Sequence, residues 1–136
     1  MKFLVTGAAG FIGKRVISQL LKKDLSVVAT TTRVETEKDI FFKYIDSKNL
    51  SHENLEFIHL DMSSKESIDS VLSSNDITHI ISCGYQMSNM IDDNPIKGVE
   101  VNILGVTNLF EAVVKYKIKR MVMPSSMSVY GNTQSI

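Results

Sequence analysis

Three glycines, at positions 7, 10 and 13, stand between an apolar run and an amphipathic segment at the very start of the chain. The run 2–6 has the pattern of a buried strand, and the apolar residues of segment 11–23 recur on one helical face. A tight passage from strand to helix needs glycine for the sharp exit and for close packing of the helix on the sheet. The order strand, glycine turn, helix predicts the opening crossover of a parallel sheet.

The same alternation continues along the rest of the chain. Short apolar runs predict four more strands, and the segments between them predict helices and loops. The predicted strands are residues 26–31, 55–60, 78–82 and 119–124, and the predicted helices begin at 11, at 63–64 and near 94–95, with an exposed helix and then a loop over 34–54. The helix that begins near Asn94 is apolar nearly all round, so we expect it to be mostly buried.

Alternating strands and helices imply a parallel sheet covered on both faces, and right-handed crossovers leave few possible strand orders. We predict an α/β fold with a Rossmann-like, doubly wound parallel sheet of order 3-2-1-4-5, in one domain over residues 1–136. In such a sheet a ligand crevice lies at the carboxyl ends of strands one and four.

The glycine turn is suited to hold a pyrophosphate. A glycine at position 10 lets backbone approach the phosphates, and the N–H groups and dipole of the following helix favour an anion. A P-loop does not fit, because its first glycine would fall on Ala8 and Arg15 stands where it needs Ser or Thr. A tight turn without a ligand is the structural alternative. The predicted pyrophosphate-binding residues are Gly7, Gly10, Phe11, Ile12 and Gly13.

Composition excludes several other classes of function. Fifteen Lys and Arg balance fifteen Asp and Glu, which argues against a broad nucleic-acid-binding surface. A single cysteine, Cys83, excludes an internal disulfide framework and fits a reducing, cytoplasmic setting. The three histidines lack partners at ligand spacing, so we expect no metal site. The apolar runs are far shorter than a membrane span.

Five motifs in order along the whole chain match one enzyme family. They are Thr6–Gly13, Asp61–Met62, Ser82–Gly84, Asn102–Asn108 and Ser125–Gly131. With these motifs the chain resembles the extended short-chain dehydrogenase/reductase family, the NAD(P)-dependent epimerase/dehydratase group, although Ile81 replaces the histidine usual in the third motif. The resemblance implies an NAD(P)-binding domain that corresponds to the first half of a complete member, truncated before the substrate domain.

The resemblance also implies roles for individual residues. It places Asp61 and Met62 beside the adenine, and it makes Ser126 the catalytic serine that polarises the substrate oxygen. Asp61 has the alternative role of a helix cap, Asn102 that of a hydrogen-bonded polar residue within a helix, and the two serines at 125 and 126 that of turn formers. The remaining cofactor-binding residues that the resemblance implies are Cys83, Gly84, Tyr85, Asn102 and Ser125.

The end of the second strand bears on the choice of cofactor. NAD-binding proteins usually carry an acid there for the ribose 2′-hydroxyl, but this chain has Thr31, Thr32 and Arg33. A threonine does not repel a 2′-phosphate, and Arg33 could donate a charge-assisted hydrogen bond worth ~1.5–3 kcal/mol. We therefore predict NADP in preference to NAD, with NAD and a solvated Arg33 as the alternative.

The resemblance implies hydride transfer at a carbinol carbon of a small-molecule substrate, with a nucleotide sugar favoured. That chemistry needs a Tyr-x-x-x-Lys pair beyond the serine to take the substrate proton. The chain reaches Ile136 without one, and Tyr44 with Lys48, which matches the spacing, lies on the adenosine side.

The sequence therefore predicts the cofactor-binding part of an NAD(P)-dependent epimerase, dehydratase or reductase, inactive on its own. The alternative is a non-catalytic NAD(P)-binding regulator or redox sensor on the same fold. Oligomeric state is left open, with a homodimer among the options.

Overall fold

A computed structural model describes residues 1–131, apart from the side chains of Ser88, Asn89 and Ser128. Five strands form one wholly parallel sheet in the order β3-β2-β1-β4-β5. This order confirms the predicted Rossmann-like, doubly wound α/β fold. The strands are β1 (Lys2–Thr6), β2 (Ser26–Thr31), β3 (Leu55–His59), β4 (His79–Ser82) and β5 (Arg120–Val122).

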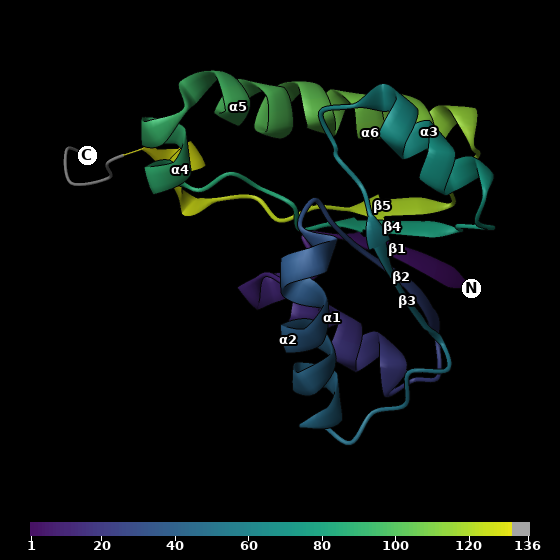
Figure 1. Ribbon diagram of the computed structural model, residues 1–136. Helices are drawn as coiled ribbons and strands as arrows, with labels where there is room; N and C mark the ends of the chain where they lie inside the picture. Colours follow the sequence, from purple (N-terminus) through teal and green to yellow (C-terminus); the bar gives the residue numbers. More distant parts are fainter. Residues whose placement is uncertain (132–136) are drawn as a thin grey trace.

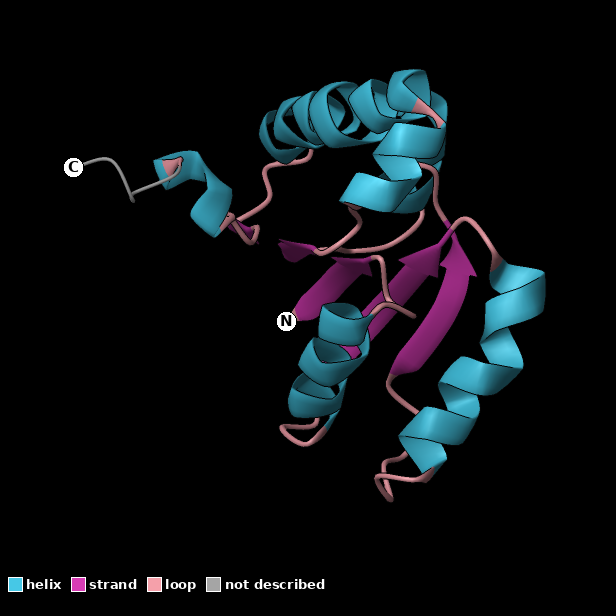
Figure 2. Cartoon of the chain, turned by 90° about the vertical axis from the view of Figure 1, so that its left-hand side faces the viewer, coloured by secondary structure: helices cyan, strands magenta, loops and turns pink. Residues whose placement is uncertain are grey.

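Helices cover both faces of the sheet (Figure 1). One face carries α1 (Phe11–Leu21) and α2 (Val34–Asp46), and the other carries α3 (Lys65–Ser73) and a long helical segment. Figure 2 shows the strands lying between these two layers. The long segment consists of α5 (Pro95–Val99), a π-helical turn η1 (Glu100–Gly105) and α6 (Val106–Lys115). The short helix α4 (Ser88–Asp93) precedes this segment, and a 3-10 turn η2 (Met127–Tyr130) follows β5.

The core has two halves, one on each face of the sheet. Leu4 of β1 packs with α3 and α6, whereas its neighbour Val5 packs with α1 and α2. This alternation follows from the two-residue period of a strand. Both side chains are fully buried, and each contributes roughly 1.5–3 kcal/mol to folding. Within residues 1–131 no helix is long and apolar enough to cross a bilayer.

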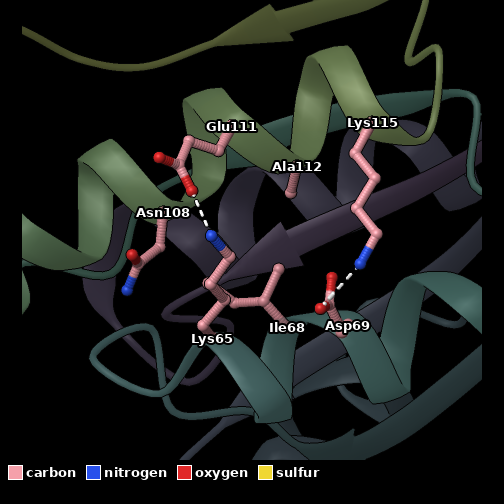
Figure 3. Close-up of a pocket in the computed structure, with 7 residues that line it drawn as sticks. All are labelled: Lys65, Ile68, Asp69, Asn108, Glu111, Ala112 and Lys115. Carbon is pink, nitrogen blue, oxygen red and sulfur yellow. Dashed lines mark hydrogen bonds and ion pairs between the residues drawn. The ribbon is translucent and has the colours of Figure 1, made fainter.

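The contact between α3 and α6 is bridged by two ion pairs at its surface. Lys65 pairs with Glu111, and the ammonium of Lys115 lies 2.8 Å from a carboxylate oxygen of Asp69. Figure 3 shows both pairs across a shallow pocket floored by apolar side chains. Because the paired groups are exposed to solvent, buried contacts such as those of Ile68 do more to hold the helices together.

The expectation that the long helical segment is mostly buried is wrong. Val101 and Leu109 are buried, but Val99, Ile103 and Phe110 are 51–63% exposed. Only one side of the segment packs on the sheet and α3, so a helix that is apolar all round must expose the rest. No other element within residues 1–131 covers that outer side.

Candidate functional site

The glycine turn between β1 and α1 is built for close approach of backbone. Gly7 has a φ of +62°, and a Cβ there would lie 2.6 Å from the carbonyl oxygen of Cys83 and 2.7 Å from the Cα of Gly84. The N–H of Ala8 donates to the carbonyl of Thr30 over 3.0 Å. The turn is therefore held between the loop after β4 and the end of β2, in a place where only glycine fits.

The helix that follows presents an unshielded N-terminus. Its cap residue is Gly10, which makes no side-chain hydrogen bond, and its first turn carries no acid. A Cβ on Gly13 would overlap the carbonyl oxygen of Gly7, which agrees with the predicted close packing of helix on sheet. The first backbone N–H groups of α1 are thus left for an anion.

A cleft of about 330 Å³ opens at the carboxyl ends of the central strands. Most of the predicted cofactor residues line it. They are Gly7, Gly10, Thr31, Thr32, Arg33, Asp61, Met62, Cys83, Gly84 and Tyr85.

Other predicted residues are placed elsewhere. Phe11 and Ile12 turn their side chains outward, with 71% and 49% of their surface exposed, so only their backbone faces the turn. Ser125 and Ser126 are exposed in the loop after β5, where the N–H of Val129 donates to the carbonyl of Ser126 over 3.2 Å. None of these residues lines the cleft, and neither do Gly13 and Asn102.

Sequence reasoning missed part of the cleft wall. Thr6 ends a strand whose carboxyl end was predicted to form the crevice, so strand position alone indicated it. Leu60 immediately precedes Asp61, which was predicted to lie beside the adenine. Glu37 stands four residues after Arg33 on a helix, a spacing that brings two side chains together. The residues that line the cleft without having been predicted are Thr6, Ala9, Glu37, Leu60, Gln86, Met90, Lys97 and Val101.

Asp61 keeps its charge although burial opposes it. One carboxylate oxygen accepts hydrogen bonds from the N–H and the hydroxyl of Ser63, at 2.9 and 2.6 Å. The ammonium of Lys97 lies 3.7 Å from the other oxygen. Burial raises the pKa of Asp61, but these hydrogen bonds and the nearby cation outweigh it, so the net pKa is lowered. Asp61 does not cap α3; Ser64 does.

Cys83 forms a small, neutral part of the cleft wall. Its thiol is partly buried, and that burial raises its pKa. A raised pKa leaves few thiolates at neutral pH, so the side chain is not an activated nucleophile. In the described part of the chain, no group of three or more potential metal ligands comes together.

Two asparagines of the long helical segment hold the loops that form the cleft walls. Asn102 accepts a hydrogen bond from the backbone N–H of Gln86 at 2.8 Å and donates one to its carbonyl at 3.0 Å. Buried Asn108 donates to the carbonyl of Met62 at 3.3 Å. Between them, Gly105 lies so near Met62 that a Cβ would sit 3.0 Å from that side chain. The motif 102–108 therefore positions the loops after β3 and β4.

We expect Asn102→Ala to weaken dinucleotide binding about tenfold, because two hydrogen bonds worth ~0.5–1.5 kcal/mol each no longer hold the loop at Gln86. Asn75→Ala is the matched control. Asn75 also makes a side-chain bond to backbone, but beside Lys2 at the opposite end of the sheet. Calorimetric titration of both variants checks this; equal losses of affinity would contradict a positioning role for Asn102.

Tyr44 and Lys48 do not form a catalytic pair at the cleft. The centre of the Tyr44 ring lies 5.1 Å from the ammonium of Lys14 and 5.5 Å from that of Lys48. Neither Tyr44 nor Lys48 lines the cleft. This placement agrees with the expectation that their spacing is coincidental.

Arg33 is not a free cation at the end of β2. Its guanidinium lies 2.5 Å from one carboxylate oxygen of Glu37, and the hydroxyl of Thr31 donates to the other at 2.6 Å. The predicted preference for NADP assumed that Arg33 was available to a 2′-phosphate. In the structure the Arg33 guanidinium is instead paired with Glu37, which partly offsets its charge.

Comparison with known proteins identifies similar chains. A family model described as the NAD dependent epimerase/dehydratase family matches residues 3–136. UDP-glucose 4-epimerase of Pisum sativum is 32% identical over 138 residues, which cover 99% of this chain and 39% of the relative.

Two solved structures are also similar. The UDP-glucose 4-epimerase of Thermus thermophilus, in complex with NAD, matches with a TM-score of 0.72 and 29% identity over 89% of this chain and 36% of that one. The UDP-glucose 4-epimerase of Thermotoga maritima, with UDP-glucose, matches with a TM-score of 0.80 and 25% identity over 100% and 41%. The chain therefore spans about two fifths of the length of these relatives.

Proposed function

Since the chain belongs to the NAD-dependent epimerase/dehydratase family, we propose that it is the dinucleotide-binding part of a nucleotide-sugar epimerase. The observation that carries the proposal is the bare N-terminus of α1, which opens beside the glycine turn into a cleft at the switch point of the sheet. The epimerases compared above support the choice of reaction and of a UDP-sugar as substrate.

The residues present fit a nicotinamide dinucleotide. Backbone N–H groups at the start of α1 would bind the pyrophosphate, and the absence of a side chain at Gly10 leaves room for it. The end of β2 would receive the adenosine ribose at Thr31 and Thr32, and Asp61 with Met62 would flank the adenine. Cys83, Gly84 and Tyr85 would line the remaining length of the cofactor.

A bound nicotinamide would supply hydride transfer at a carbinol carbon of the substrate. Ser126 would donate a hydrogen bond to the substrate oxygen at that carbon, a role that rests on its motif and on its position after β5. No Tyr-x-x-x-Lys pair follows Ser126 in the 136 residues, so we propose binding without turnover for this chain alone. The single thiol favours a cytoplasmic setting.

Titration of the purified chain with NADH, followed by nicotinamide fluorescence and by thermal melting, tests the proposal. We expect saturable binding at one site. At a ligand concentration of 100 times Kd, folding should be stabilised by about 2.7 kcal/mol. ADP-ribose should compete, because it carries the pyrophosphate and both riboses. Absence of binding and of any melting shift at millimolar NADH would overturn the proposal.

A further inference from the structure

The first turn of α2 places a carboxylate beside the end of β2. The strand itself ends without an acidic residue. Glu37 lines the cleft with only 18% of its side chain exposed. It accepts a hydrogen bond from Thr31, and its other oxygen pairs with Arg33. The N–H of Arg33 donates in turn to the hydroxyl of Thr31 at 3.2 Å. Thr31 and Arg33, linked to each other, thus hold the Glu37 carboxylate in a fixed place beside the ribose-binding end of the cleft.

This carboxylate keeps capacity to accept more hydrogen bonds. An ionised carboxylate has about four acceptor positions, and two of them are used by Thr31 and Arg33. A ribose hydroxyl is a donor that matches the remaining positions. A 2′-phosphate is a dianion that brings acceptors only, so it would meet like charge.

The cations near the cleft are already engaged. Two cationic side chains line the cleft within residues 1–131, namely Arg33 and Lys97. Arg33 pairs with Glu37, while the ammonium of Lys97 lies 3.7 Å from Asp61 and 3.4 Å from Glu100. A 2′-phosphate would therefore have to share a cation with a carboxylate that already offsets its charge.

We infer that Glu37 selects NAD over NADP by accepting the ribose hydroxyls and repelling a 2′-phosphate. The inference rests on the proposed function, because it takes the cleft to be a dinucleotide site. It reverses the preference expected from Thr31 and Arg33 alone. The acid that usually ends the second strand is replaced by one from the next helix, six residues further along the chain.

The test compares the affinities of NADH and NADPH for the wild-type chain, Glu37→Gln and Glu35→Gln, measured by nicotinamide fluorescence. Glu35 is the matched control, since it lies in the same helical turn and is exposed outside the cleft. We expect the wild-type chain to bind NADH at least about tenfold more tightly than NADPH. Glu37→Gln should shift that ratio about tenfold or more toward NADPH, and Glu35→Gln should leave it within about twofold.

Melting curves of each variant check that the protein keeps its wild-type stability, so that a shifted ratio reports recognition of the cofactor. Equal or tighter binding of NADPH by the wild-type chain would overturn the inference and leave the proposed function standing. Equal shifts in Glu37→Gln and Glu35→Gln would also overturn it, because net charge would then explain the preference. Failure of both dinucleotides to bind the wild-type chain would overturn the proposed function together with the inference.

Discussion

Replacing Gly7 with alanine is expected to cost at least about 4 kcal/mol of folding free energy. The backbone at Gly7 lies in the left-handed region, which alone costs an L-residue about 1–2 kcal/mol. The new Cβ would also press against the backbone of Cys83 and Gly84, which cannot move without displacing the end of β4. Since small domains are stable by about 5–15 kcal/mol, much of the stability is lost.

Chemical denaturation of Gly7→Ala beside Gly131→Ala separates the two causes. Gly131 has a similar φ of +68°, but a Cβ there would meet no atom of residues 1–131 within 4 Å. The control therefore carries the backbone strain without the collision, and we expect it to lose only about 1–2 kcal/mol. Equal losses in the two variants would show that contact with the loop after β4 contributes nothing.

Replacing Gly10 with aspartate is expected to abolish dinucleotide binding, weakening it more than about 100-fold, while the protein remains folded. Gly10 caps α1 with an extended φ and ψ of −69° and 170°, a conformation that aspartate adopts readily. The new carboxylate would take the first N–H groups of the helix and place a negative charge where the pyrophosphate binds. Its favourable capping offsets the 3.1 Å contact with the Gly7 carbonyl, so stability should change by less than about 1 kcal/mol.

Gly10→Ala provides the uncharged comparison. Its Cβ is the same, but the helix N–H groups stay free, so we expect a loss of affinity below about tenfold. Titration with NADH and melting curves measure both quantities for each variant. If Gly10→Asp binds NADH nearly as tightly as the wild-type chain, the pyrophosphate does not lie on this turn.

Local patterns were sufficient to predict the strands and their order. β1 and β2 match their predicted bounds, because apolar runs ended by turn residues leave little choice of conformation. β5 is shorter than its predicted range of 119–124, since Pro124 has no N–H to donate to a ladder. The exposure of the long helical segment could not be predicted from its apolar residues, because burial depends on what packs against each side.

The sequence predicted the part of the cleft that depends on backbone conformation. It did not predict the part that depends on which side chains pair with one another. The place of Gly7 could be predicted because few residues other than glycine can adopt the backbone conformation of this turn. The pairing of Arg33 with Glu37 follows from their spacing, but its place in the cleft depends on how α2 is oriented at the end of β2, and the strand pattern holds no information about that. Asn102 was expected to line the cofactor site, yet it acts on Gln86, which the motif spacing does not indicate.

The central place of β1 in the sheet has a consequence during synthesis. β1 is synthesised before β4, one of its two neighbours in the sheet, which ends at Ser82. At ordinary rates of translation the nascent chain waits on the order of ten seconds before that partner exists. Until then Phe3 to Val5 can pair with β2 along one edge only, and the other edge stays open to a chaperone or a neighbouring nascent chain.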